Sequence, residues 1–172
     1  MKIEVNNLKK KFKSVIAVKN ISFKIEKNQT MGLLGPNGCG KTTSIGMMLG
    51  LIKPTSGNIL IDNKDINKSD KNYLLEKINF ASPYVELPKK LTVRQNLEIY
   101  GRLYGVVNLI ERIEEIVEDL NINSYLDKKT GELSSGQKNR VSLAKSLINK
   151  PKLLFLDEPT ASLDPDVGDF VR

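Results

Sequence analysis

A glycine-rich segment between two apolar runs constrains the fold of this chain more than any other feature. Residues 35 to 43 read GPNGCGKTT, and SIGMMLGL follows them. The run TMGLLG before the motif predicts a short strand buried on both faces, and the segment after it predicts a helix. A strand, a glycine-rich turn and a helix in this order indicate an α/β core.

The glycine-rich turn has the composition of a phosphate-binding loop. Gly35 to Thr42 fits G-x-x-x-x-G-K-[ST], in which small residues let backbone N–H groups surround an anion. The following helix points its positive end at the same place. Lys41 would contact the β- and γ-phosphates, and the Thr42 hydroxyl would coordinate Mg²⁺. The alternative, a plain turn with a chance lysine, is less well supported once a strand and a helix flank the motif.

A second segment supplies the carboxylates that a magnesium-bound triphosphate needs. In LLFLDEPT, residues 153 to 160, four apolar residues are followed by two acids. The strand delivers Asp157 at its carboxyl end, where ligands collect in open α/β sheets. We expect Asp157 to hold the metal, directly or through water, and Glu158 to position and deprotonate the attacking water.

The remaining pattern places further strands around the motif and helices in the middle of the chain. Alternating or continuous apolar residues predict strands at IEVNN, NISFKIE, the end of PTSGNILID, INFA and KLLFLDE. One helix is expected after Thr92 as N-cap. Another carries an apolar stripe of Ile110, Ile113, Val117 and Leu120. A third starts at SSGQ and places Val141, Ala144, Leu147 and Ile148 on one face.

Composition narrows the chemistry. The 172 residues contain no histidine and one cysteine, which excludes a catalytic imidazole and an internal disulfide within this chain. The net charge of +7 comes from scattered lysines without tryptophan or interleaved aromatic residues, so a solvated surface is favoured over a nucleic-acid footprint. Cys39 is expected to fill a variable position of the loop rather than to act as a redox sensor.

Four motifs in order make the chain resemble the ATP-binding subunit of ABC transporters. LSSGQ, residues 133 to 137, resembles the LSGGQ signature of that family, and SLD, residues 162 to 164, resembles its D-loop. Phe12 occupies the position of the aromatic residue that stacks on adenine, and LTVRQNL resembles the start of the helical sub-domain. The similarity covers nearly the whole chain.

The resemblance implies an α/β P-loop NTPase (RecA-like) core with an antiparallel β sub-domain and a helical signature sub-domain. The domain would span residues 1–172, with the helical sub-domain inserted at approximately 85–140. It implies ATP and Mg²⁺ as ligands and Glu158 as the catalytic residue, with Thr42 and Asp157 on the metal. The nucleotide-binding residues it implies are Phe12, Gly35, Pro36, Asn37, Gly38, Cys39, Gly40, Lys41, Thr42, Thr43, Ser134, Gly136, Gln137 and Asp164.

The signature also has a physical interpretation of its own. Ser134 and Gln137 have the spacing of a capping box, so a helix begins here with free N–H groups and a positive dipole. One nucleotide does not need two such helix starts in one chain. The family resemblance accounts for this with a head-to-tail dimer, in which Ser134 and Gly136 serve the nucleotide held by the partner.

The match departs from the family pattern in three places. Ser82 and Pro83 stand where the family has a metal-contacting glutamine, and Ser135 replaces the first signature glycine. The family's later histidine is absent, because the chain ends at Arg172. The resemblance therefore indicates a C-terminally truncated domain, whose own hydrolysis is expected to be weak or absent.

We expect the chain to bind MgATP and, as a dimer, to hydrolyse it for a separate transmembrane permease at the cytoplasmic face of the cell membrane. Two alternatives stay open: a soluble ABC-type ATPase acting on nucleic acid or the ribosome, and a non-hydrolysing nucleotide-binding module. The first is disfavoured because no coiled-coil or cysteine-rich insertion lies between Thr43 and Leu133, so no nucleic acid is expected. The transported substrate and the direction of transport are not encoded here, although an exporter is favoured.

Overall fold

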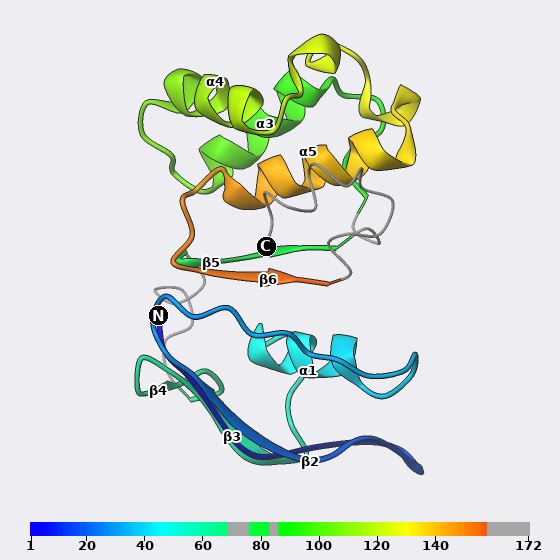
Figure 1. Cartoon of the computed structure of the whole chain (residues 1–172), viewed down its shortest axis with the longest axis vertical. Coiled ribbons are helices and arrows are strands. Elements are labelled where there is room, and N and C mark those ends of the chain that lie inside the picture. The colour runs from blue at the N-terminus through cyan, green and yellow to red at the C-terminus, as the bar shows by residue number, and fades with distance from the viewer. Residues whose placement is uncertain (69–75, 83–85, 158–172) are drawn as a thin grey trace. The chain divides into compact units, whose positions relative to one another are not determined.

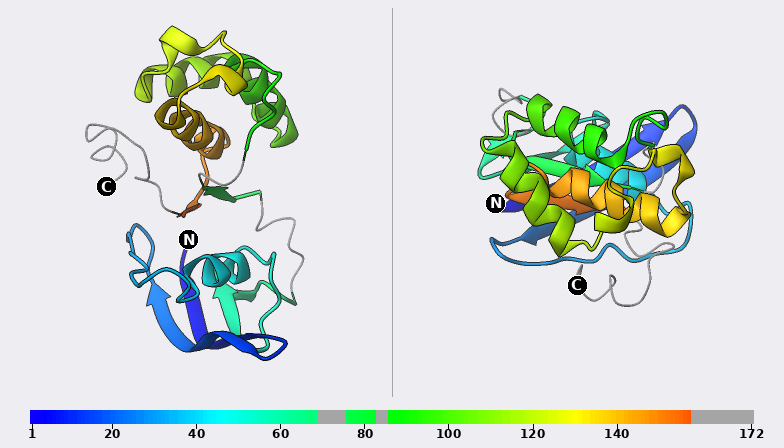
Figure 2. Two further views of the ribbon diagram at one scale, coloured as in Figure 1. Left: turned by 90° about the vertical axis from the view of Figure 1, so that its right-hand side faces the viewer. Right: turned by 90° about the horizontal axis from the view of Figure 1, so that it is seen from above.

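The computed structural model describes residues 1–68, 76–82 and 86–157, and the chain divides into two compact units, Met1–Leu75 and Glu76–Arg172. Each unit has its own sheet, and in the described residues α1 (Lys41–Met48) belongs to the first unit while the later helices belong to the second (Figures 1 and 2). Within the described ranges, every helix is too short or too polar to cross a membrane.

In its described residues, the first unit is an antiparallel sheet with one helix, α1 (Lys41–Met48), packed against β2 (Val15–Ile25) (Figure 2). Ile3, Val5, Ile59 and Ile61 are fully buried, and Val5 pairs with both Phe23 and Ile59 at the centre of the sheet. The strand order is β2-β1-β3-β4. Its elements are β1 (Ile3–Phe12), β2 (Val15–Ile25), α1 (Lys41–Met48), β3 (Ser56–Ile61) and β4 (Lys64–Asp65).

The prediction of a strand at TMGLLG, residues 30 to 35, is wrong. Residues 30 to 36 have no regular secondary structure, and Leu34 is 95% exposed. A strand exists only where a neighbour satisfies its backbone N–H and C=O groups. In the described part of this unit, the sheet consists of β1 to β4 and offers this segment no pairing partner. The apolar run therefore lacks the ladder that would make it a strand.

The second unit stacks helices on a two-stranded parallel sheet (Figure 1). Helix α5 packs against β5, and α3 and α4 pack against α5 and each other. Both predicted strands are confirmed, with Phe80 opposite Phe155 in the pairing. The elements are β5 (Ile78–Ala81), α3 (Val93–Leu103), α4 (Leu109–Asp119), the short 3₁₀ turns Asn123–Tyr125 and Thr130–Glu132, α5 (Ser135–Leu147) and β6 (Leu153–Leu156).

Two helix starts are confirmed down to their side-chain hydrogen bonds. The Thr92 hydroxyl accepts from Gln95 N at 3.1 Å while Gln95 Oε1 accepts from Thr92 N at 3.0 Å. The same reciprocal pair joins Ser134 and Gln137 at the start of α5. Each capping box satisfies two backbone donors that the first turn would otherwise leave open.

The apolar stripe predicted for residues 109 to 120 is mostly confirmed. Ile113, Val117 and Leu120 are buried as expected, but Ile110 is 75% exposed and Ile116 is buried in its place. Residues 113, 116, 117 and 120 follow the i, i+3, i+4, i+7 spacing of a core-facing stripe, which starts one turn later than predicted. The same core includes Val141, Ala144 and Ile148 of the third helix segment, with Leu147 partly buried beside them.

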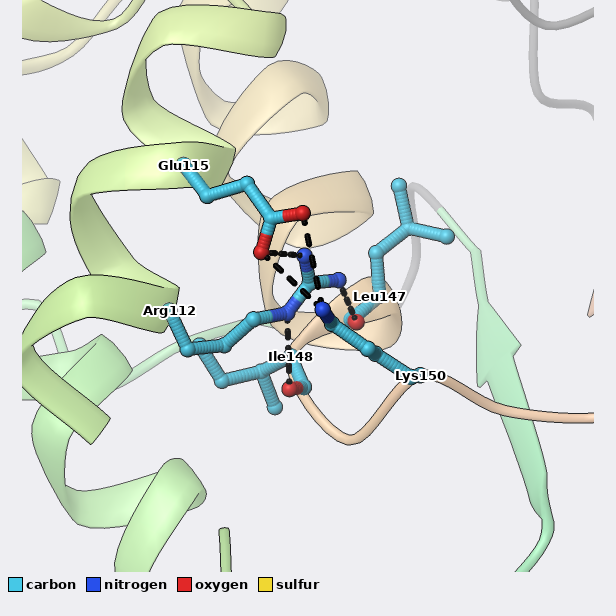
Figure 3. Close-up of polar contacts among 5 residues, drawn as sticks. All are labelled: Arg112, Glu115, Leu147, Ile148 and Lys150. Carbon is cyan, nitrogen blue, oxygen red and sulfur yellow. Dashed lines mark hydrogen bonds and ion pairs between the residues drawn. The ribbon is translucent and has the colours of Figure 1, made fainter. Parts of the chain in front are cut away.

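Arg112 closes the C-terminal end of α5 (Figure 3). Its guanidinium donates to Leu147 O at 2.6 Å and to Ile148 O at 3.2 Å, and it also donates to Glu115 Oε2 at 2.6 Å. Lys150 approaches the same carboxylate at 3.2 Å. The last carbonyl groups of a helix have no intrahelical partner, so this arginine supplies the donors that α5 lacks and ties α4 to it.

Candidate functional site

The glycine-rich loop of the first unit leads directly into α1. Gly38 and Gly40 adopt left-handed backbone angles, with φ of 81° and 97°. A turn is closed by a hydrogen bond from Cys39 N to Pro36 O at 3.3 Å. The Lys41 ammonium lies back across the loop and donates to Gly35 O at 2.7 Å and Pro36 O at 3.0 Å. The Lys41 side chain and the backbone turn thus both make hydrogen bonds to the carbonyl groups at the start of the loop.

Helix α1 begins without a side-chain cap. Its N-cap is Gly40, which carries no side chain, whereas α3 and α5 both begin with a hydroxyl-bearing capping box. Ser44 N donates to Gly40 O at 2.8 Å, so the regular helical hydrogen bonds start at once. A helix start that is exposed and not capped by its own side chains directs backbone N–H groups and the positive end of the dipole outward, which suits an anionic ligand.

Two glycines of the loop are closely approached by neighbouring atoms, Gly40 by backbone and Gly35 by a side chain. A Cβ on Gly40 would lie 2.3 Å from the Ala17 carbonyl oxygen and 3.0 Å from Val18 Cγ2, so the loop rests directly on β2. A Cβ on Gly35 would lie 2.6 Å from Cys39 Sγ, which places the Cys39 side chain against the Gly35 backbone. The Cys39 thiol is free and exposed, and its role in the loop stays a prediction.

Phe12 ends the same strand pair on which the loop rests. It is 45% exposed at the end of β1, paired with Val15 of β2. The sequence did not single out Lys10, whose Nζ lies 4.7 Å from the centroid of the Phe12 ring. A signal was present, because residues two apart on a strand share a face. Phe12 and the loop from Gly35 to Thr43 thus belong to the same unit, and both are supported by the β1–β2 strand pair.

The predicted acidic residues belong to the second unit. Asp157 directly follows β6 and is 4% exposed, and its N–H donates to Ala81 O at 3.0 Å. Because Ala81 pairs with Leu156, Ser82 and Asp157 follow paired ends of two parallel strands. Glu158 and Asp164 lie outside the described residues. Thr42 belongs to the first unit and Asp157 to the second, and the hydroxyl and the carboxylate each offer an oxygen atom, the ligand type that Mg²⁺ prefers.

The signature residues also lie in the second unit, at the start of α5. The Ser134 hydroxyl and the Gln137 amide are committed to each other's backbone N–H groups. Within the described residues, the N–H groups of Ser135 and Gly136 make no hydrogen bond. The outward-facing donors of this helix start are therefore backbone groups, and the side chains of Ser134 and Gln137 maintain its shape.

A lysine-bearing glycine loop at a helix start, with a buried aspartate after a parallel strand, defines a P-loop nucleotide-binding protein of the α/β class. Residues 18–161 match the family model described as ABC transporter. The chain belongs to the ABC transporter family.

Curated relatives are export and multidrug proteins. The chain is 36% identical over 165 residues to the Nod factor export ATP-binding protein I of Burkholderia lata, which covers 95% of this chain and 54% of that protein. It is 38% identical over 165 residues to the probable multidrug ABC transporter ATP-binding protein YbhF of Escherichia coli, covering 95% and 28% of the two chains. The chain thus spans about half the length, or less, of the curated relatives it matches.

Solved structures support the fold. The ATP-binding cassette MJ0796, solved as a dimer in a post-hydrolysis state with ADP and Pi, matches with a TM-score of 0.86 at 29% identity, covering 97% of this chain and 78% of that one. A putative ABC transporter ATP-binding protein from Pyrococcus furiosus matches with a TM-score of 0.85 at 31% identity, covering 99% and 82%. The predicted fold class, an α/β P-loop NTPase with antiparallel β and helical sub-domains, is confirmed.

Proposed function

We propose that this chain binds MgATP and, as a head-to-tail dimer, hydrolyses it to power transport by a separate transmembrane permease. The observation that carries the proposal is the glycine loop: Lys41 folded across it, Gly40 in a left-handed conformation, and an α1 start with no side-chain cap. Family membership and the export and multidrug relatives support the transport role.

In the proposed binding mode, different residues of the first unit contact the phosphates and the adenine base. The backbone N–H groups of residues 37 to 42 surround the phosphates, and Lys41 exchanges its carbonyl partners for the β- and γ-phosphate oxygens. Phosphate oxygens are stronger acceptors for an ammonium than peptide carbonyls, so this exchange is favourable. Phe12 offers its exposed ring to the adenine. Gly35, Pro36, Asn37, Gly38, Cys39 and Thr43 complete the loop.

Thr42 and Asp157 would hold Mg²⁺, which when bound neutralises charge on the β- and γ-phosphates. Glu158 follows Asp157 in the chain. As general base it would accept a proton from the water that attacks the γ-phosphorus, while the bond to the β–γ bridging oxygen breaks. The products are ADP and phosphate.

The second nucleotide contact comes from another copy. Ser135 and Gly136 are the first two residues of α5, whose backbone N–H groups have no carbonyl partner within the helix, and a helix start attracts anionic phosphate. We assign Ser134, Gly136 and Gln137 to the nucleotide held by the partner, with Asp164 at the same interface. The partners are thus a second ATP-binding subunit and a permease, and the dimer would lie at the cytoplasmic face of the cell membrane.

ATP binding and hydrolysis test the proposal separately. Titration with a fluorescent ATP analogue in excess Mg²⁺ is expected to saturate, and Lys41→Ala is expected to weaken binding by about tenfold or more, because a hydrogen bond to a charged group is lost. Lys27→Ala removes the same charge from an exposed loop and serves as the control. If the unaltered chain does not bind ATP, the proposal is wrong.

In the full-length protein, Glu158→Gln is expected to keep ATP binding and to abolish phosphate release. Under the same conditions this variant is expected to accumulate as an ATP-bound dimer in sedimentation experiments. Phosphate release that survives Glu158→Gln would remove Glu158 from its proposed role. Full-length protein that binds ATP without ever releasing phosphate would instead be a non-hydrolysing module.

A further inference from the structure

Lys10 occupies one face of the Phe12 ring. Its Nζ lies 4.7 Å from the ring centroid, within the range of a cation–π interaction. The ring itself is 45% exposed, so a substantial part of its surface stays open to solvent. The two faces of this aromatic side chain are therefore chemically different: one is covered by an ammonium group and the other can receive a ligand.

The ammonium of Lys10 is held in place from a second direction. Nζ donates to the carbonyl oxygen of Lys53 at 2.7 Å. Lys53 belongs to the connection between α1 and β3, and this connection is fastened to β1 by two further hydrogen bonds, Thr55 N to Lys9 O at 2.8 Å and Lys11 N to Thr55 Oγ1 at 3.0 Å. The Lys10 ammonium thus contacts both the segment that follows α1 and the Phe12 ring.

The same strand register joins Lys10 to the phosphate loop. Lys10 pairs with Val18 across β1 and β2. Val18 in turn touches the loop, since its Cγ2 lies 3.0 Å from the position of a Cβ on Gly40. Strand pairing and close packing therefore connect Lys10, which contacts the Phe12 ring, with Gly40, the N-cap of α1. A base stacked on this ring and phosphates held by the loop would share one rigid support.

We propose that Lys10 is a positioning residue for the nucleotide base, acting through Phe12. The ammonium blocks one face of the ring and fixes its orientation, so that a planar purine stacks only on the opposite face. A ring already held in its bound orientation loses less conformational freedom when the base arrives, which strengthens binding without a new contact to the nucleotide. The inference rests on the proposed ATP binding and adds to it a determinant of base affinity.

The test compares a ligand with a base to one without. ATP and inorganic tripolyphosphate are titrated in excess Mg²⁺ against the 172-residue chain and its Lys10→Met, Lys10→Arg and Lys11→Met variants. Lys10→Met is expected to weaken ATP binding by about two- to fivefold, the range of an exposed cation–π contact, and to leave tripolyphosphate binding unchanged. Lys10→Arg is expected to restore ATP affinity, because guanidinium also stacks on aromatic rings.

Lys11→Met removes the same charge from the neighbouring residue and is expected to leave both ligands unaffected. The inference also requires that Lys10→Met have no effect on ATP affinity in a Phe12→Ala background, because Lys10 acts through the ring. Equal weakening of ATP and tripolyphosphate, or an unchanged ATP affinity in Lys10→Met, would overturn it. If Lys10→Met melts at a lower temperature than the unaltered chain, Lys10→Gln replaces it. Failure of the unaltered chain to bind either ligand would instead contradict the proposed function.

Discussion

A Cβ atom on Gly40 would lie 2.3 Å from the backbone carbonyl oxygen of Ala17. Because Gly40 lies this close to β2, the phosphate loop packs directly on the strand pair that carries Phe12. It also coincides with a φ of 97° at Gly40, which residues with a side chain rarely adopt. Close contact and backbone conformation therefore both disfavour any larger residue at this position.

Gly40→Ala is expected to destabilise the chain by about 1–3 kcal/mol, the cost of holding a residue with a side chain in a sparsely populated backbone region. It is also expected to weaken ATP binding, because β2 or the start of α1 must move. Urea denaturation and nucleotide titration measure the two effects. Gly32→Ala is the matched control, since its Cβ would meet nothing within 4 Å. Equal stabilities of the two variants would contradict the close contact.

The features that sequence predicted best depend on a few neighbouring residues. Thr92 with Gln95 and Ser134 with Gln137 form complete capping boxes within four residues, so no distant part of the chain needs to be known. The glycine loop is predictable for the same reason. Its pattern of Gly, Lys and Thr encodes a local backbone shape together with the following helix.

The features that sequence missed depend on partners elsewhere. The run TMGLLG has the composition of a buried strand, but composition does not supply the neighbouring strand that must pair with it. Ile110 lies on a helix with an apolar stripe, yet which turn of the stripe reaches the core depends on where α3 and α5 pack. Lys10 was missed because its role requires knowing the position of the Phe12 ring and of Lys53 O.

Ser134 allows its structural and functional roles to be separated. Ser134→Ala removes the hydroxyl that accepts from Gln137 N and is expected to cost about 1 kcal/mol of unfolding free energy. Ser134→Asp keeps an acceptor that caps as well as serine. It places a negative charge where a partner's phosphate would bind. We expect Ser134→Asp to unfold at the same urea concentration as the unaltered chain and to lose ATP-dependent dimerisation. A stable Asp variant that still dimerises would argue against the signature's phosphate contact.

Arg112 is expected to matter more for stability than a surface arginine. Its side chain is 12% exposed and donates to two carbonyl groups at the end of α5 as well as to Glu115. Arg112→Met leaves these acceptors without their charged donor and is expected to cost at least about 2 kcal/mol. Thermal and urea denaturation measure the loss.

Arg94→Met provides the comparison for Arg112. Arg94 pairs with Asp127 at 3.0 Å, but the two side chains are 45% and 77% exposed. Exposed ion pairs contribute about 0–1 kcal/mol because water and salt screen them. The two substitutions remove the same side chain from the same group of helices. If Arg94→Met were as damaging as Arg112→Met, the capping of α5 would not explain the effect.

Glu115 gives the Arg112 cluster a dependence on pH. Hydrogen bonds from Arg112 and then from Lys150 hold the pKa of Glu115 below its usual 4.5. A carboxylate with a lowered pKa stabilises the folded chain at pH values above 4.5, and this contribution disappears as the pH falls through the folded-state pKa. Glu115→Gln is therefore expected to lower the urea midpoint at pH 7, and the difference from the unaltered chain is expected to shrink below pH 4.5. Glu118→Gln changes an exposed carboxylate of the same helix and serves as the matched control. A Glu115→Gln difference that stays constant from pH 7 to pH 3 would rule out the ionised Glu115 as the source of the effect.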